Sequence, residues 1–279
     1  MLDLDSINTS FSRKALVYDA YGAENAAVRW TRAQVRTQVL QMAQPGAKIL
    51  ELNAGTGEDA AYFVQHGLRV HATDLADGMV AEIRRKIERE NLHGRLTAQQ
   101  LSFLDIEQAP GGPFDMVFSN FGGLNCVPLA YLRTVAEKLP LVLRPGGALV
   151  WVLMPPVCPW ELAQALRGRF AVAFRRVRGH ARAHVEGAYF STFYFYPSHV
   201  IQLLRPNFVG FRLQALSVFS PPAFMEGFPT RWPRLFHALT WLDARVSRWP
   251  LLNSIGDFFI LTGYRVPFSP AGRKDRGEG

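Results

Sequence analysis

The stretch from Lys48 to Asp59 constrains the fold of this chain more than any other. It reads K-I-L-E-L-N-A-G-T-G-E-D, so a short apolar run is followed at once by two glycines and then by a helix-like segment. A buried strand, a glycine turn and a helix N-terminus together form a unit that binds nucleotides. Gly55 and Gly57 let the backbone approach a ligand and adopt dihedral angles that side chains disfavour. Glu51, at the end of the strand, would repel a pyrophosphate, so the pattern favours a cation such as an amino acid's ammonium group.

A second strand supports this interpretation. Residues 69–79 read R-V-H-A-T-D-L-A-D-G-M, an alternating run that ends in Asp74. An acidic residue that closes the second strand, about 20 residues after the glycine turn, binds a ribose diol. Asp74 lies 17 residues after Gly57, which fits this spacing.

With these two motifs the chain resembles the class I S-adenosylmethionine-dependent methyltransferases. Within that family it is most similar to the ubiquinone-biosynthesis type, which acts on small or lipophilic acceptors. The resemblance covers roughly Phe11 to Pro155 and includes an F-D-x-V pattern at 114–117 and an R-P-G-G-x-L phrase at 144–149. One position departs from the family's acid-x-Gly-x-Gly-x-Gly motif, because Asn53 stands at the first glycine. Asn tolerates left-handed backbone better than most residues, so we expect the turn to be kept.

The resemblance implies an α/β fold: a doubly wound, mostly parallel seven-stranded sheet with an antiparallel last strand, plus lid insertions after strands five and six. The expected parts are N-terminal cap helices (1–46), a Rossmann-like S-adenosylmethionine-binding core (47–156), a lid of helix and hairpin (157–207), C-terminal strands (208–268) with a helical insertion (221–250), and a disordered tail (269–279). Within the lid we predict a helix over Trp160–Phe170 and a hairpin over Val172–Pro197, with its turn at Glu186-Gly187 and an aromatic second arm at Tyr189–Tyr196.

The resemblance also implies a set of residues that bind S-adenosyl-L-methionine. Asp105, at the end of the third strand, would accept a hydrogen bond from the adenine amino group. Leu75 and Met79 would form apolar walls beside the adenine, although Met79 fits a plain core position equally well. Tyr21 is a candidate for a lid over the cofactor or for packing at a helix end. The full predicted set is Tyr21, Glu51, Asn53, Gly55, Gly57, Asp74, Leu75, Met79, Asp105, Ile106, Asn120 and Phe121.

Fewer sequence features point to the residues that bind the methyl acceptor. Asn125, His184, Tyr194 and Tyr196 are the candidate substrate residues. A general base is needed only if the acceptor must lose a proton. The histidines outside the nucleotide-binding half are His180, His184, His199 and His237; each alone is more often structural than catalytic, and we assign no catalytic residue. The acceptor atom (O, N or C) and the oligomeric state are left open.

Several other chemistries find no support. No Asn-Pro-Pro-aromatic motif follows the fourth strand, which argues against methylation of nucleic-acid bases at amino groups. Cys126 and Cys158 follow strands four and five, where cytosine-C5 RNA methyltransferases keep their cysteines, but the neighbouring residues do not match. No P-loop, zinc motif or other metal site is recognised. Two functional alternatives are a non-catalytic S-adenosylmethionine-binding or partner-binding module and a nicotinamide-dependent oxidoreductase; Glu51 and Asn53 within the turn speak against the second.

Composition adds the cellular context and the charge. The chain has 279 residues and two cysteines without a disulfide pattern, and it begins without a signal-like segment; we expect a cytoplasmic enzyme. The net charge of +8 lies in residues 157–250, which hold 12 Arg, no Lys and 4 acids. That surface would meet an anionic substrate, membrane headgroups or solvent; no nucleic-acid partner is expected. Residues 228–250 combine apolar helical spacing with Trp and Arg, which indicates either peripheral membrane contact or a helix packed on its own domain.

Overall fold

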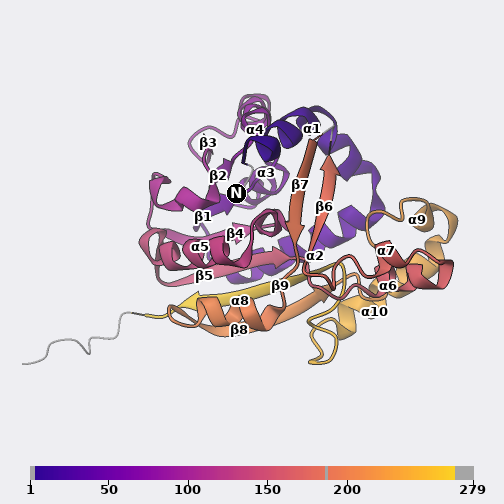
Figure 1. Cartoon of the computed structure of the whole chain (residues 1–279). Helices are drawn as coiled ribbons and strands as arrows, with labels where there is room; N and C mark the ends of the chain where they lie inside the picture. The colour runs from indigo at the N-terminus through magenta and orange to yellow at the C-terminus, as the bar shows by residue number, and fades with distance from the viewer. Residues whose placement is uncertain (1–3, 186–187, 268–279) are drawn as a thin grey trace, which may run out of the picture.

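One seven-stranded sheet organises the described residues, 4–185 and 188–267, of the computed structural model (Figure 1). The strand order is β3-β2-β1-β4-β5-β9-β8, and β9 runs antiparallel to both of its neighbours while the other neighbouring pairs are parallel. The strands are β1 (Lys48–Leu52), β2 (Arg69–Asp74), β3 (Leu96–Gln100), β4 (Phe114–Ser119), β5 (Leu143–Leu153), β8 (Phe208–Leu216) and β9 (Phe258–Arg265). The predicted doubly wound sheet with an antiparallel last strand is confirmed. The order reverses between β1 and β4, and such a switch point opens a ligand crevice at the carboxyl ends of the strands.

Helices cover both faces of this sheet because its central strands are apolar on both sides. One core cluster packs α2, α3 and α4 against the sheet, and the other packs α5 and α8 against the opposite face. The helices are α2 (Ala26–Met42), α3 (Glu58–Gln65), α4 (Asp77–Arg89), α5 (Leu129–Val142) and α8 (Pro197–Leu204), with the short 3-10 helices η1 (Phe103–Gln108) and η2 (Gly123–Cys126).

The N-terminal helix α1 (Leu4–Glu24) lies across the start of α4. The Ser12 hydroxyl donates to the Asp77 carboxylate at 2.6 Å. Gly78 permits this close approach, since a Cβ at that position would lie 2.8 Å from the backbone of Ser12. The Thr56 hydroxyl, beside the glycine turn, donates to the carboxylate of Asp19. These bonds fix α1 over the carboxyl ends of the strands.

The segment between β5 and β8 begins with α6 (Pro159–Leu162), η3 (Ala163–Arg167) and α7 (Phe170–Ala173). A two-stranded hairpin of β6 (His180–Val185) and β7 (Ala188–Phe193) follows and lies beside α1 (Figure 1). The predicted hairpin over Val172–Pro197 was too long at both ends, because Val172 belongs to α7 and Pro197 starts α8. Its predicted turn, Glu186-Gly187, lies outside the described residues.

A buried ion-pair cluster fixes the base of this hairpin segment. The guanidinium of Arg176 donates to Glu161 on α6 at 2.8 Å and to Asp257 before β9 at 2.7 Å. All three side chains are buried. Because a buried charge is costly unless it is paired, this cluster ties the lid segment to the sheet.

Between β8 and β9 the chain forms α9 (Gly227–Arg231) and α10 (Pro233–Val246), which lie at the side of the molecule away from β3 (Figure 1). Buried Asp243 of α10 accepts hydrogen bonds from the backbone amides of Phe219 and Ser220, both at 2.9 Å. Within the part of the chain that the structure describes, no helix has the length and apolar character needed to cross a membrane. The predicted disordered tail, 269–279, lies outside the described residues.

Candidate functional site

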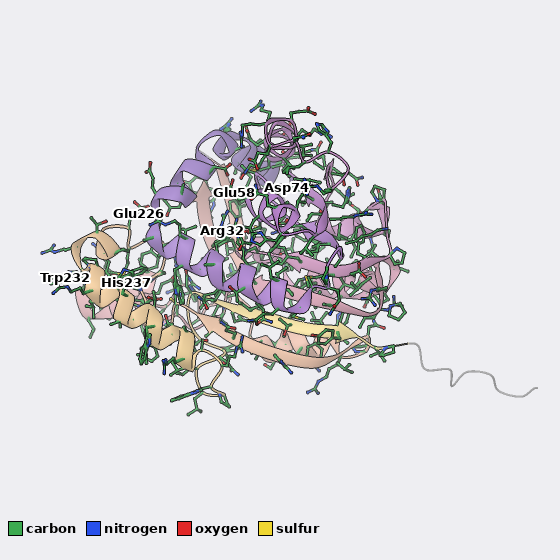
Figure 2. The ribbon with its side chains drawn as sticks, turned by 180° about the vertical axis from the view of Figure 1, so that it is seen from behind. Arg32, Glu58, Asp74, Glu226, Trp232 and His237 are labelled. Atoms are coloured by element: carbon green, nitrogen blue, oxygen red, sulfur yellow. The ribbon has the colours of Figure 1, made fainter. Side chains whose placement is uncertain are left out.

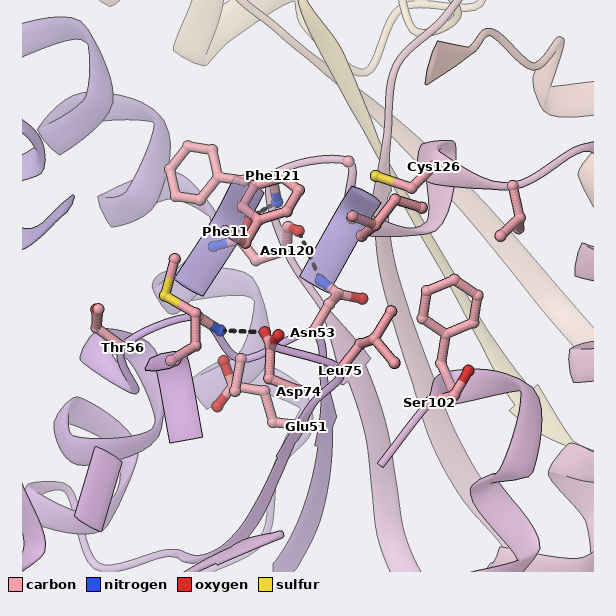
Figure 3. Close-up of a pocket in the computed structure, with 18 of the residues that line it drawn as sticks. Phe11, Glu51, Asn53, Thr56, Asp74, Leu75, Ser102, Asn120, Phe121 and Cys126 are labelled. Carbon is pink, nitrogen blue, oxygen red and sulfur yellow. Dashed lines mark hydrogen bonds between the residues drawn. The ribbon is translucent and has the colours of Figure 1, made fainter. Parts of the chain in front are cut away.

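A cavity of about 190 Å³ lies at the carboxyl ends of β1, β2 and β4, at the switch point of the sheet (Figure 3). Its floor comes from the glycine turn after β1 and from the ends of β2 and β4. Its roof comes from α1 and β7. The start of α4 and the segments after β3, β4 and β5 complete the wall. The lining residues include Ile7, Phe11, Arg32, Glu51, Asn53, Gly55, Glu58, Asp59, Asp74, Leu75, Met79, Leu101, Ser102, Phe103, Asn120, Phe121, Cys126, Met154, Phe190 and Thr192.

The glycine turn places three alternate residues in left-handed backbone. Asn53 has φ 46°, Gly55 has φ 58° and Gly57 has φ 77°. The Ala54 amide donates to the Thr73 carbonyl at 2.9 Å, which joins the turn to β2. The prediction that Asn53 keeps the turn in place of a glycine is confirmed.

Asn53 also provides contacts that a glycine lacks. Its side-chain amide donates to the carbonyl of Asn120 at 3.2 Å, and its side-chain oxygen accepts from the Ser119 hydroxyl at 2.9 Å. Gly123 packs directly on this side chain, since a Cβ there would lie 2.2 Å from the Asn53 amide nitrogen. Asn53 therefore connects the end of β1 to the end of β4.

Glu51 has a carboxylate oxygen without a partner. Its side chain is 2 % exposed, and its Oε2 has no hydrogen-bond partner among the described residues. Burial, and then the nearby Asp59 carboxylate, raise the pKa of Glu51 well above its usual value. An unsatisfied buried carboxylate is costly, so its position in the cavity suits a cationic ligand group.

Asp74 is held in a fixed orientation at the end of β2. Its two carboxylate oxygens accept from the backbone amides of Gly55 and Ala76, both at 2.9 Å. Burial raises the pKa of Asp74 to about 6. Figure 3 shows Glu51 and Asp74 beneath the same part of the cavity, and the charge of Asp74 contributes to the raised pKa of Glu51. Each oxygen retains acceptor capacity for a hydroxyl donor.

The end of β4 supplies Asn120 and Phe121, as predicted. The Asn120 amide donates to the carboxylate of Asp59 at 2.8 Å, and the Asn120 side-chain oxygen accepts from the Phe121 amide at 2.7 Å. Asp59 itself pairs with Arg36 of α2 at 2.7 Å. This chain of contacts fixes the cavity wall from α2 through α3 to β4.

Asp105 and Ile106 do not line the cavity, in contrast to the prediction. β3 ends at Gln100, and η1 then turns the Asp105 side chain toward Lys138, whose Nζ lies 4.0 Å from its carboxylate. Ile106 is fully buried in the core beneath α5. Ser102 and Phe103 occupy the cavity wall instead.

Two further predicted cofactor residues lie beside the cavity and not in its wall. Tyr21, at the end of α1, is 39 % exposed and its hydroxyl accepts from the Asn25 amide at 3.3 Å. Gly57 caps the N-terminus of α3 and faces the side chain of Ile83. Four other predicted cofactor residues, Leu75, Met79, Gly55 and Asn53, lie in the lining of the cavity.

Of the predicted acceptor residues, the three with described side chains have different partners, and none of them is among the residues that line the cavity. Asn125 is buried and structural: its amide donates to the carbonyl of Phe193 at 2.6 Å, and its oxygen accepts from the Met154 amide at 3.0 Å. Tyr194 is buried with its ring 5.3 Å from the Arg176 guanidinium. Tyr196 is exposed next to His199. The side chain of His184 lies outside the described part.

The sequence predicted a cap from the N-terminal helices and a lid from the hairpin, but it did not single out the residues that form the roof of the cavity. Ile7 and Phe11 of α1 and Phe190 and Thr192 of β7 all line it. The rings of Phe11 and Phe190 contact each other with centroids 5.4 Å apart. An apolar face on α1 was a local signal, but nothing local could show that a hairpin so distant in sequence packs on it.

Comparisons with known proteins agree with this geometry. A family model described as "Methyltransferase domain" matches residues 49–147, which run from β1 through the glycine turn to the start of β5. The chain is 37 % identical over 133 residues to a demethylmenaquinone methyltransferase of Beutenbergia cavernae, covering 47 % of this chain and 50 % of that protein. It is 30 % identical over 164 residues to a malonyl-[acyl-carrier protein] O-methyltransferase of Serratia marcescens, covering 57 % of each. The chain thus spans about half the length of the curated relatives it matches.

Solved structures extend the likeness to nearly the whole fold. The CcbJ methyltransferase from Streptomyces caelestis superimposes with a TM-score of 0.61 at 16 % identity, covering 93 % of this chain and 98 % of that one. At that identity the likeness concerns the fold alone. Together, the comparisons show that residues 49–147 are similar to a methyltransferase domain and that the chain has an α/β fold like that of the solved methyltransferase.

Proposed function

We propose that this chain is an S-adenosylmethionine-dependent methyltransferase that transfers a methyl group to a small-molecule or lipid-like hydrophobic acceptor. The observation that carries the proposal is the partnerless Oε2 of Glu51 beside Asp74 in one cavity. An amino acid's ammonium group suits the first carboxylate and a ribose diol suits the second. S-adenosylmethionine presents both groups in one molecule. A dinucleotide would bring its pyrophosphate toward Glu51, which disfavours the nicotinamide alternative.

The residues of the cavity fit the parts of this cofactor. In the proposal Glu51 binds the ammonium group and Asp74 accepts from the diol. Leu75 and Met79 flank the adenine, and Ser102 and Phe103 take the place at its edge that the family pattern suggested for Asp105. Asn120 and Phe121 border the methionine end.

The bound cofactor supplies a methyl group already activated on a sulfonium. The protein's part is to position the two reactants and to exclude water. Phe11 and Phe190 close the roof over the cavity. No histidine is found among the described residues that line it, and burial raises the pKa of the Cys126 thiol to about 12, so that this thiol is neutral near pH 7.

The acceptor is either a free hydrophobic molecule or one tethered to a carrier, as the names of the two curated relatives suggest for those proteins. The proposal is tested by incubating the protein and cell extracts with methyl-labelled S-adenosylmethionine. We expect S-adenosylhomocysteine and label in a lipid or quinone-like fraction, and much less of both with Asp74→Ala at a cofactor concentration that does not saturate the variant. Tight cofactor binding without turnover on any fraction would favour the non-catalytic binding module.

Peripheral contact with an anionic membrane through residues 228–250 stays a prediction. Trp232, Trp241 and Trp249 are 53 %, 57 % and 60 % exposed. Figure 2 shows Trp232 and His237 at the edge of the molecule, away from Asp74, so this surface is not part of the cavity. Sedimentation with anionic vesicles at low salt, and its loss on replacing Arg231, Arg234, Arg245 and Arg248 with Gln, would support the contact. If the protein does not sediment with the vesicles at low salt, the predicted membrane contact is wrong.

A further inference from the structure

A second hollow opens directly beside the cofactor cavity. It has a volume of about 860 Å³ and lies between α1, the start of α5 and the β6–β7 hairpin; we call it the outer groove. The outer groove and the cavity share Ile7, Cys126 and Phe190 as lining residues. The two spaces are therefore neighbours, separated by side chains that are apolar or, in the case of the Cys126 thiol, neutral.

The outer groove is strongly basic. Arg175, Arg178, His180 and Arg182 line it, and its described lining residues include no Asp or Glu. Arg175 is neutralised, because its guanidinium donates to both carboxylate oxygens of Glu161 at 2.7 and 2.6 Å. No described carboxylate lies within ion-pair distance of Arg178 or Arg182. The guanidinium of Arg182 stacks 4.5 Å from the centre of the Tyr189 ring, which orients it on the hairpin.

The charge in the groove differs in kind from that of the cavity. The cavity is lined by four carboxylates, Glu51, Glu58, Asp59 and Asp74, against one guanidinium, Arg32, whereas the described lining of the groove has the cations of Arg178 and Arg182 and no carboxylate. Like charges on neighbouring side chains repel, and a concave wall concentrates their field on whatever enters. A guanidinium is suited to carboxylate and phosphate groups through its planar set of donors. An acceptor that spans both spaces would keep an anionic group outside and bring an uncharged, apolar end inside.

We propose that the outer groove binds an anionic group of the acceptor through Arg178 and Arg182, while an apolar part of the same molecule passes Ile7 and Phe190 to the cofactor. This assignment rests on the proposed function for the identity of the inner end. It specifies the substrate class as a small amphiphile with a carboxylate or phosphate at a distance from the reacting atom. A neutral quinone or an uncharged lipid would leave both guanidinium groups without a partner.

The test uses simple probes of this chemistry. Octyl phosphate, octanoate and octanol are titrated calorimetrically into the full-length protein, below their aggregation concentrations, with and without saturating S-adenosylhomocysteine. We expect the two anions to bind at least about tenfold more tightly than octanol, the gain expected from a charged hydrogen bond. Whichever of octyl phosphate and octanoate binds more tightly indicates whether the acceptor bears a phosphate or a carboxylate.

The variant Arg178→Gln/Arg182→Gln should lose about tenfold in affinity for the anions and none for octanol. Both side chains are exposed, so the fold should be retained. The matched control is Arg231→Gln/Arg234→Gln, which removes the same charge outside the outer groove and should bind as the wild type does. Equal affinities of octanol and the anions, or unchanged anion binding in the groove variant, would overturn the proposal. If the wild-type protein did not bind S-adenosylhomocysteine but still bound the anions through Arg178 and Arg182, the proposed function would be refuted and the anion site would be retained.

Discussion

The rings of Phe11 on α1 and Phe190 on β7 meet with their centroids 5.4 Å apart, above the cofactor cavity. These two residues are far apart in the sequence: Phe11 precedes the first strand of the sheet, and Phe190 follows β5. Their contact joins the N-terminal helix to the hairpin and forms the roof of the cavity. A ligand on Glu51 and Asp74 would therefore be covered by a pair of side chains that must separate for exchange.

The first prediction concerns this roof. Phe11→Ala and Phe190→Ala should each weaken S-adenosylhomocysteine binding, since each opens the cavity to water. The double variant should show a coupling of about 0.5–1.5 kcal/mol, the range for an aromatic pair. Calorimetry of the four proteins measures it, with Tyr264→Ala, an exposed aromatic of β9, as the control. Purely additive losses would mean that the two rings do not act as one roof.

The second prediction concerns the glycine turn. Asn53→Gly should retain cofactor affinity because glycine adopts the φ of 46° without strain. It should also lower the melting temperature, because two side-chain hydrogen bonds worth about 1 kcal/mol each are lost. Asn53→Val should lose affinity as well, since a β-branched residue resists left-handed backbone. Equal affinity in all three proteins would show that the turn makes no such demand.

The third prediction concerns Asp105, which the family pattern places beside the adenine but which lies beside Lys138 in this structure. Asp105→Ala should leave S-adenosylhomocysteine affinity within about twofold of the wild type, because the Asp105 side chain faces Lys138 and not the cavity. A replacement in the cavity wall, Leu101→Ala, should weaken binding through lost apolar contact. A tenfold loss of S-adenosylhomocysteine affinity in Asp105→Ala would show that this carboxylate does bind the adenine amine.

The fourth prediction is a pH dependence. The pKa of Asp74 is raised to about 6 in the cofactor-free protein, and the ionised form is the better acceptor for the ribose diol. Binding therefore lowers this pKa and releases a proton, so the affinity should fall as the pH drops through about 6. Protonation of Asp74 alone changes the logarithm of the association constant by up to one unit per pH unit. The pKa of Glu51 is also raised by burial, so its ionisation on binding a cationic group contributes with the same sign.

The same linkage fixes the sign for stability. The folded pKa of Asp74 lies above its ordinary value of 3.8, so its contribution to the stability of the cofactor-free protein is present at low pH and is lost as the pH rises through about 6. Bound cofactor should reverse this trend. Melting curves with and without S-adenosylhomocysteine, for the wild type and Asp74→Asn, provide the measurement. An identical pH profile in both proteins would contradict the role of Asp74.

Local patterns in the sequence predicted the floor of the site well. Glu51, Asn53 and Asp74 stand at the ends of short apolar strands, and the carboxyl ends of neighbouring parallel strands meet at one edge of a sheet. Asp105 lies outside the cavity wall because β3 ends at Gln100 and a 3-10 helix follows it, so the predicted contact of Asp105 with the adenine stays a prediction. Strand ends and turn rotations depend on tertiary packing, which spacing alone does not encode.

The individual residues of the roof and of the acceptor side could not be predicted for a different reason. Phe190 meets Phe11 only because the hairpin is fixed at its base by Asn125 and by the Arg176 cluster. Asn125 was predicted to contact substrate, but its side chain is buried, its amide donates to the carbonyls of Met154 and Phe193, and its oxygen accepts from the Met154 amide. Contacts of this range join segments whose separate sequences carry no common signal.

The central claim is that Glu51 binds the amino-acid part of the cofactor and Asp74 its ribose. The most direct measurement is calorimetric titration of two ligands, S-adenosylhomocysteine and 5′-methylthioadenosine, which share the nucleoside but differ in the amino-acid part. Asp74→Ala should weaken both ligands by about tenfold to a hundredfold, the cost of a lost charged hydrogen bond of roughly 1.5–3 kcal/mol. Glu51→Gln should weaken S-adenosylhomocysteine by a similar factor and leave 5′-methylthioadenosine unchanged. Tight binding of NADH in place of both ligands, or equal effects of Glu51→Gln on the two, would contradict the account.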